Sequence, residues 1–386
     1  MNNADNFIAQ GNTYREQHKP EMALTQYMLA MTADRNNSGA FNNYGNVLRE
    51  LGDPGGAIPF LQRAIQLNPS VVTHQFNLAV AYLLSGDYVQ GWPAYECRHN
   101  YEHLKGTIPE YKCPVWNGEA LTGKSIFVRG EQGHGDIIQF VRFIQNLKNI
   151  GASVTIQVTD ALIPLIQSGP LGQDVRVLSF SQELGQEFDY WIPIMSLPGK
   201  LNVRVDNLPN TIQYLFADPK LVENWRRNLG LKTKLRIGFA WSGRRDSWIN
   251  QHKSVPFEKM LAMIQSCPEY SWYNLQYDCT DEEQAQLVAA GVHCFPGGIN
   301  SFADTAALIS NFDVVVSVDT AVAHLSAALG RPTWIMLNSY GQCWRWLLNR
   351  NDTPWYSTAR LFRQPDMAQW DPVIAHIKQH LKLFKI

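Results

Sequence analysis

The chain has 386 residues, of which 45% are hydrophobic and 17% charged. That length exceeds what one hydrophobic core usually serves, so we expect two or three domains. Thirty-three Lys and Arg residues stand against 34 Asp and Glu residues, which gives a formal net charge of -1. Such a balance argues against nucleic acid or an anionic membrane as the main partner.

The first ten residues, MNNADNFIAQ, have neither the basic start nor the apolar core of a signal peptide. No later stretch offers about 18 uninterrupted apolar residues, so we expect a cytoplasmic protein without a transmembrane segment. Six cysteines are scattered, without a CxxC pair or a ligand-like spacing to His. The sequence therefore indicates reduced thiols and no metal site.

A period of 34 residues runs through the first hundred residues. Equivalent positions carry Gly11, Gly45 and Ala79; Tyr14, Leu48 and Tyr82; Ala23, Ala57 and Gly91; and Tyr27, Leu61 and Tyr95. Small residues let paired helices approach closely, and larger ones fill the gap between pairs. The pattern resembles the tetratricopeptide repeat, in about three copies, and we assign residues 1–105 to it. Such arrays bind proteins in a groove, which predicts a protein partner; a purely structural cap is the alternative.

From about Tyr111, short β-rich runs alternate with amphipathic helical stretches, as in βαβ units with parallel sheets. We expect strands at residues 124–129, 153–158, 175–178 and 190–194 in a first lobe, and at 236–241, 271–276, 313–318 and 333–337 in a second. The sequence thus predicts a helical array followed by an α/β fold of two Rossmann-like lobes facing a cleft, at residues 106–215 and 216–386. One hypothesis for the C-terminal helix is that it packs back on the first lobe.

The turn Gly130-Glu131-Gln132-Gly133-His134-Gly135-Asp136 follows an expected strand and opens an apolar-periodic helix. Glycines let a backbone approach a ligand, and a helix N-terminus favours anions. The spacing is not the dinucleotide fingerprint GxGxxG, so a nicotinamide enzyme is a weak interpretation. Asp136 either caps the helix or serves as general base toward an acceptor hydroxyl. Gln132 and His134 are candidate acceptor or cleft contacts.

A second strand-to-helix turn runs from Val318 to Leu325. Ala321 keeps its first turn slim, so backbone amides there could receive a diphosphate, with Thr320 adding a hydroxyl donor. Asp319 and Thr320 would cap a helix in any case. We count Asp319, Thr320, Ala321 and His324 among the candidate donor-binding residues.

A third segment follows the first strand of the second lobe, Ser242-Gly243-Arg244-Arg245-Asp246, and ends in His252-Lys253-Ser254-Val255-Pro256. Cations at a sheet edge could neutralise a leaving phosphate, whereas the plain alternative is a solvated loop. We include Ser242, Gly243, Lys253 and Gln276 in the candidate donor site.

A fourth segment, residues 343–356, brings aromatic side chains and arginines together after the last expected strand. Trp344 and Arg345 are candidate acceptor or cleft residues, because a base or sugar ring can stack on tryptophan. Packing between the lobes is the alternative.

Taken in order, these segments resemble glycosyltransferase family 9, the heptosyltransferase-like group, and most closely its bacterial members with tetratricopeptide repeats in front. The resemblance is carried by GEQGHGDIIQFVRFI, by HKSVPFEKM after RIGFAWSG, and by VDTAVAHLSAALGRPTWIML running into WRWLLNRNDTPWY, and covers about residues 114–365. It implies the two-lobed GT-B architecture with the nucleotide held mainly by the second lobe. It also implies that Asp136 is the base, that Lys253 contacts donor phosphate, and that residues 319–324 line the donor site. Classical heptosyltransferases lack the repeats and act on lipopolysaccharide core, so the sugar and acceptor do not carry over.

Our hypothesis is that the protein transfers a sugar from a nucleotide-diphosphate sugar to an acceptor, with inversion and without a metal ion. The nucleotide-diphosphate sugar is a substrate, and we expect no cofactor. No DxD sequence is present to hold a metal at the diphosphate. Two alternatives stay open: a non-catalytic adaptor with a degenerate transferase body, and a nucleotide-sugar epimerase. The sequence does not specify the base, the sugar or the acceptor.

Overall fold

The computed structural model describes residues 3–209, 211–245, 252–295 and 297–384. These residues divide into two compact units. One unit contains the chain up to Pro109 together with Leu201–Leu208 and Ser339–Arg350. The other contains the remaining described residues. The domain boundaries given above stay predictions.

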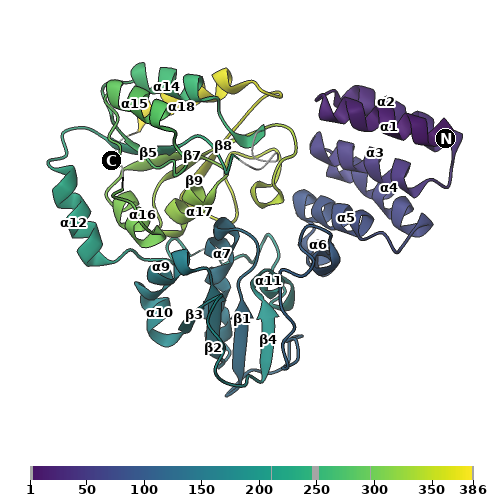
Figure 1. The fold of residues 1–386 in the computed structure, drawn as a ribbon, viewed down its shortest axis with the longest axis horizontal. Coiled ribbons are helices and arrows are strands. Elements are labelled where there is room, and N and C mark those ends of the chain that lie inside the picture. The colour runs from purple at the N-terminus through teal and green to yellow at the C-terminus, as the bar shows by residue number, and fades with distance from the viewer. Residues whose placement is uncertain (1–2, 210, 246–251, 296, 385–386) are drawn as a thin grey trace. The chain divides into compact units, whose positions relative to one another are not determined.

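Six helices of the described N-terminal part form three successive pairs and stack in chain order (Figure 1). Their bounds are α1 (Asn3–Glu16), α2 (Pro20–Ala33), α3 (Ser38–Glu50), α4 (Pro54–Leu67), α5 (Val72–Ser85) and α6 (Tyr88–Tyr95). A Cβ on Gly11 would lie 2.5 Å from Cε1 of Tyr27, and one on Gly45 would lie 2.8 Å from Cγ of Leu61. The small and large residues of the 34-residue period therefore pack against each other, and the expected repeats are confirmed.

Two distant segments complete this repeat unit. Trp92 Nε1 donates a hydrogen bond of 2.9 Å to the carbonyl oxygen of Val203. From the other segment, the Tyr340 hydroxyl donates to Glu50 Oε2 at 2.5 Å, and the Gly341 amide donates to the Glu50 carbonyl at 2.9 Å. The core of the repeat unit is thus built from three stretches of the chain.

The α/β unit contains a four-stranded parallel sheet in the order β3-β2-β1-β4 among its described residues. The strands are β1 (Ser125–Arg129), β2 (Ser153–Val158), β3 (Arg176–Ser179) and β4 (Tyr190–Pro193). Its helices are α7 (His134–Phe140), α8 (Ile144–Asn149), α9 (Ile163–Gln167), α10 (Pro170–Asp174) and α11 (Leu197–Lys200), with short 3-10 turns including η2 (Val141–Phe143) and η4 (Ile194–Ser196). All four strands expected in the first lobe are confirmed.

A second parallel sheet has the order β6-β5-β7-β8-β9 in the described part of the chain. The strands are β5 (Arg236–Ala240), β6 (Ser271–Asn274), β7 (Val314–Val318), β8 (Thr333–Leu337) and β9 (Ala359–Arg363). Its helices are α12 (Pro219–Leu229), α14 (Phe257–Gln265), α15 (Asp281–Ala289), α16 (Phe302–Ile309), α17 (Ala321–Ala328) and α18 (Trp370–Leu383). The four expected strands are present, and β9 is an additional one.

The C-terminal helix α18 belongs to the core of the second sheet. Its residues Trp370, Val373 and Ile377 lie in one buried cluster with Ile237 of β5 and Val316 of β7. The apolar face of α18 therefore packs on the second sheet. Packing of this helix back on the first lobe stays a prediction. The motifs with candidate chemistry all follow carboxyl ends of strands, where open parallel sheets bind ligands.

Candidate functional site

The turn after β1 holds the candidate base in a defined orientation. Asp136 is the third residue of α7, and its Oδ2 accepts a hydrogen bond of 2.9 Å from the Gly133 amide. Gln132 is exposed and has a φ of 61°, a left-handed conformation that is costly for a residue with a Cβ. The Asp136 side chain thus has the capping role expected as one alternative, and it remains only half-buried at the start of the helix.

The turn after β7 presents the N-terminus of α17. Thr320 is the N-cap residue, but its side chain makes no capping hydrogen bond; its hydroxyl lies 3.2 Å from that of Ser317. Ala321, the first helical residue, contributes only a methyl group. Backbone amides at such a helix start carry a partial positive charge that attracts phosphate oxygens.

These two turns contact each other. A Cβ on Gly135 would lie 3.0 Å from Cδ2 of His324 and 3.4 Å from Cα of Ala321. Close by, the ring of His134 packs edge-on against Phe302 of α16, with centroids 5.0 Å apart. Burial lowers the pKa of His134, which keeps the ring neutral at neutral pH. The structure therefore brings the Asp136 turn together with the start of α17.

Lys253, Asp319 and His324 lie together, with the Asp319 carboxylate between the other two side chains. Lys253 Nζ lies 2.9 Å from Asp319 Oδ2, and His324 Nε2 lies 3.7 Å from Asp319 Oδ1. The Asp319 side chain is 8% exposed, so its charge is poorly solvated and is compensated by the lysine. Three candidate donor-binding residues, taken from motifs 66 residues apart, are thus neighbours.

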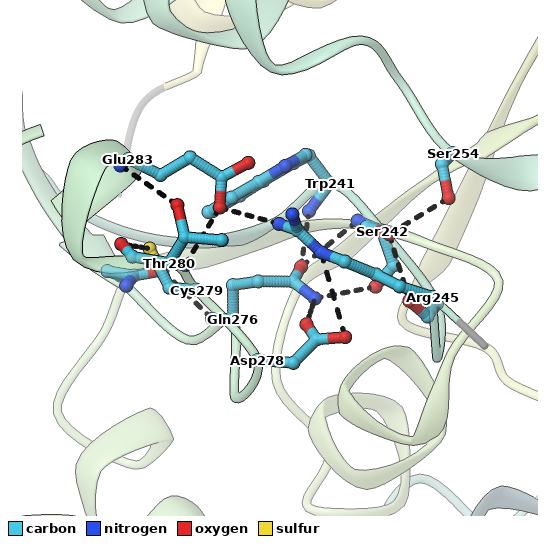
Figure 2. A network of polar contacts seen from close by, with 11 residues as sticks. Trp241, Ser242, Arg245, Ser254, Gln276, Asp278, Cys279, Thr280 and Glu283 are labelled. Carbon is cyan, nitrogen blue, oxygen red and sulfur yellow. Dashed lines mark hydrogen bonds and ion pairs between the residues drawn. The ribbon is translucent and has the colours of Figure 1, made fainter. Parts of the chain in front are cut away.

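Gln276 organises the loop after β5 (Figure 2). Its Oε1 accepts hydrogen bonds from the amides of Trp241 and Ser242 at 3.1 and 3.0 Å, while its Nε2 donates to the Ser242 carbonyl at 3.0 Å and to Asp278 Oδ1 at 2.5 Å. The Ser242 hydroxyl lies 3.0 Å from that of Ser254. Gln276 therefore holds the backbone of the candidate loop in place, and buried Gly243 follows directly.

The charged end of the same loop is anchored to α15. Arg245 Nη2 pairs with Glu283 Oε2 at 2.6 Å, and Arg245 Nε lies 3.7 Å from Asp278 Oδ2 (Figure 2). Residues 246–251, which include Asp246 of the third motif, lie outside the described residues.

Trp344 and Arg345 belong to the repeat unit. Trp344 is 4% exposed, and its ring packs edge-on against Trp92, with centroids 5.4 Å apart. It also meets Tyr88 and Tyr95, each at 6.4 Å. The Arg345 guanidinium carbon lies 4.3 Å from the Trp344 ring centroid. Both residues lie in a different compact unit from the other candidates, in a 3-10 turn, η5 (Trp344–Trp346).

Two buried residues of the α/β unit, Tyr356 and Arg142, were not singled out individually from the sequence. Tyr356 is 3% exposed, and its hydroxyl lies 2.8 Å from Nδ1 of His324. Arg142, buried in η2, donates to the Trp355 carbonyl at 2.6 Å and to the Tyr214 hydroxyl at 2.9 Å. Both lie in segments singled out from the sequence: Tyr356 is in the fourth motif, and Arg142 is in the segment GEQGHGDIIQFVRFI. Nothing in either segment indicated which partners these two side chains have.

No group of three or more His, Cys, Asp or Glu side chains among the described residues is placed to hold a metal ion. A separate search of the same residues finds no helix long and apolar enough to span a membrane.

The fold defines a class of protein: a helical repeat region joined to an α/β region with two parallel sheets, in which helices begin just after the carboxyl ends of strands. Comparison with known families agrees. Residues 38–71 match the model of the tetratricopeptide repeat, and residues 272–337, from β6 to β8, match that of glycosyltransferase family 9 (heptosyltransferase). The chain thus combines a tetratricopeptide repeat with a C-terminal domain of the heptosyltransferase-like kind, and the match supports a glycosyltransferase.

Individual relatives extend the comparison over most of the chain. Protein FlbA of Caulobacter vibrioides is 24% identical over 430 residues, which cover 96% of this chain and 71% of that protein. A crystal structure of a family 9 glycosyl transferase from Veillonella parvula aligns with a TM-score of 0.52 at 11% identity, covering 69% of this chain and 97% of the other. At this level of identity, the structural similarity shows a shared fold and nothing more.

Proposed function

We propose that this protein transfers a sugar from a nucleotide-diphosphate sugar to an acceptor hydroxyl, by a single inverting displacement without a metal ion. The repeat array recruits a protein acceptor or partner in this proposal. The family match and the fold support the reaction class, while the repeat match supports a protein partner.

The observation that carries the proposal is the contact between the turns that begin α7 and α17, at Gly135 and His324. A transferase must bring a base near the acceptor and cationic groups near the diphosphate into one site. Asp136 stands directly after Gly135, and Ala321 stands at the helix start on the other side of the contact. In this proposal, the turn that begins α7 provides the base, and the adjacent turn that begins α17 provides the diphosphate-binding amides.

In the proposed step, the acceptor oxygen attacks the anomeric carbon while the bond from that carbon to the diphosphate oxygen breaks. The acceptor proton passes to the Asp136 carboxylate, and the electron pair of the broken bond remains on the diphosphate. One displacement inverts the anomeric centre, and it requires one carboxylate. The Gly133 amide, which binds Asp136 Oδ2, fixes the direction in which that carboxylate points.

The leaving diphosphate is stabilised in this proposal by Lys253, by the Thr320 hydroxyl and by the amides at the start of α17. Asp319 holds Lys253 by an ion pair of 2.9 Å. Gln276 keeps the Ser242–Gly243 backbone in position beside them.

Asp136→Asn tests the proposal. We expect a thermal-shift screen with common nucleoside diphosphates to find one that stabilises the wild-type protein, because a bound ligand raises the free energy of unfolding. The variant should keep that shift and lose transfer by about a hundredfold or more, as a lost general base does. Unchanged turnover would remove Asp136 from the mechanism.

Asp304→Asn is the matched control. Asp304 is also the third residue of its helix, and its Oδ2 accepts a hydrogen bond of 2.9 Å from the Ser301 hydroxyl. A capping defect should therefore lower the stability of both variants, while only Asp136→Asn should lose transfer. A wild-type protein that no nucleoside diphosphate stabilises would favour an adaptor, and product formed from donor alone would favour an epimerase.

A further inference from the structure

Tyr356 is a buried tyrosine that contacts Arg142 of η2 and His324 of the candidate donor site. It lies on the segment before β9, and its hydroxyl is 2.8 Å from Nδ1 of His324. Its ring faces the guanidinium of Arg142, with 4.6 Å from the guanidinium carbon to the ring centroid. Both Tyr356 and His324 are at most 4% exposed, so water does not compete freely for their hydrogen bond.

The Tyr356 hydroxyl and the Asp319 carboxylate lie at opposite nitrogens of the His324 ring. A neutral imidazole carries one proton, and a hydroxyl that donates to Nδ1 places that proton on Nε2. Nε2 is the atom that points toward Asp319 Oδ1, at 3.7 Å. With the proton there, a partial positive charge faces the carboxylate; with the proton on Nδ1, a lone pair would face it and repel it.

Asp319 transmits this orientation to Lys253. One carboxylate oxygen faces His324 and the other lies 2.9 Å from Lys253 Nζ, with the Asp319 side chain 8% and the Lys253 side chain 18% exposed. A lysine side chain has four rotatable bonds, so its ammonium group stays in one place only if a partner holds it. The position of the Lys253 charge therefore depends on the orientation of the Asp319 carboxylate.

We infer that Tyr356 is a positioning residue for binding of the donor diphosphate, acting through His324 and Asp319 on Lys253. This inference rests on the proposed function, in which Lys253 contacts the diphosphate. Tyr356 itself touches no reacting atom. Its contribution is to keep the lysine charge placed before the ligand arrives, which lowers the ordering cost of binding.

Tyr356→Phe removes only the hydroxyl and is the direct test. We expect it to weaken binding of the nucleoside diphosphate that stabilises the wild-type full chain, measured by calorimetry, by about fivefold, as for one lost hydrogen bond. Tyr214→Phe is the matched control. The Tyr214 ring also packs on Arg142, at 4.4 Å, and its hydroxyl donates to the Ile138 carbonyl at 3.0 Å, so stability should fall in a similar way while affinity stays within about twofold.

A double-mutant cycle separates positioning from a general loss of structure. If Tyr356 acts through Lys253, then Tyr356→Phe should have no further effect on affinity in a Lys253→Ala background. Additive losses in the double variant would assign Tyr356 a merely structural role and overturn the inference. Unchanged or increased affinity of Tyr356→Phe alone would also overturn it.

The same binding measurements distinguish a failure of the role inferred for Tyr356 from a failure of the proposed function. If no nucleoside diphosphate binds the wild-type protein, the proposed donor site fails and the role of Tyr356 fails with it. If the wild type binds and Lys253→Ala weakens binding while Tyr356→Phe does not, the donor site stands and only the role of Tyr356 is wrong.

Discussion

Gly135 and His324 are packed so closely that a Cβ on Gly135 would come within 3.0 Å of His324 Cδ2. Gly135 is not among the described glycines with positive φ, so its backbone does not require glycine. The requirement comes from the neighbouring helix. Space, and not turn geometry, explains why this position of the glycine-rich segment has no side chain.

Gly135→Ala should therefore lower the free energy of unfolding by about 1–3 kcal/mol, as overpacking does, although alanine favours a helix. Gly55→Ala is the control, because Gly55 is likewise the second residue of its helix and a Cβ there would lie 3.8 Å from the nearest atom, Asp53 Oδ1. Urea unfolding should show the control unchanged or more stable. Equal stability of the two variants would contradict the packing argument.

Glu50 should make the stability of the protein depend on pH in the acid range. Burial alone would raise the pKa of Glu50, but the hydrogen bond and charge of Arg15, with further help from Arg49 and Tyr340, lower it below the ordinary 4.5. A lowered pKa contributes stability that is present above about pH 4.5 and is lost as the pH falls through the value in the folded protein.

Glu50→Gln should accordingly lower the free energy of unfolding by about 1–3 kcal/mol at pH 7, because Arg15 loses its charged partner. The variant should lose less stability than the wild type between pH 5 and pH 3 in thermal unfolding followed by circular dichroism. Exposed Glu102→Gln should follow the wild-type curve. If the stability of wild type and Glu50→Gln fell in parallel with pH, the Glu50 carboxylate would not be the source of the acid dependence.

Trp344→Ala should destabilise the repeat unit by about 3–5 kcal/mol, the cost of removing a buried indole. Nucleoside diphosphate affinity should not change, since the ring packs on Tyr88, Trp92 and Tyr95. Tyr277→Ala, at a side chain that is 97% exposed, should leave stability at the wild-type level. A Trp344→Ala protein of normal stability with weakened ligand binding would support the stacking role considered from the sequence.

Gln276→Leu should reduce stability even without ligand, by about 1–3 kcal/mol, because the Trp241 and Ser242 amides lose their acceptor. Thermal unfolding of the ligand-free protein measures this. Gln286→Leu, on the exposed side of α15, is the control. A residue that only contacted the donor would leave the ligand-free stability unchanged, and that outcome would make Gln276 a direct contact.

The strands that could be predicted are rich in apolar, β-branched and aromatic residues and have no charged residue in their interior. Residues 314–318 are buried throughout, and all but Ser317 are valines, which is the pattern of a central parallel strand. β9 was missed because it lies at the edge of its sheet, and its sequence ARLFR interrupts the apolar run with Arg360 and Arg363.

The candidate site was predictable where a motif lies on one stretch of chain. Asp136 and the residues from Asp319 to His324 follow strands and open helices, and such positions can be read locally. Contacts between segments that are far apart in the sequence could not be predicted from it. The Arg142 guanidinium meets the Trp355 carbonyl across 213 residues, and nothing near Arg142 in the sequence indicates that partner.

The repeat unit is assembled from three separated pieces of chain, and this determines how the protein can be taken apart. A cut after Pro109 would leave Trp344 and Leu347 without the helices that cover them, so an isolated α/β fragment should aggregate. The repeats are consequently not an exchangeable cassette. A chimaera that replaced them with another array would also have to exchange residues 201–208 and 339–350.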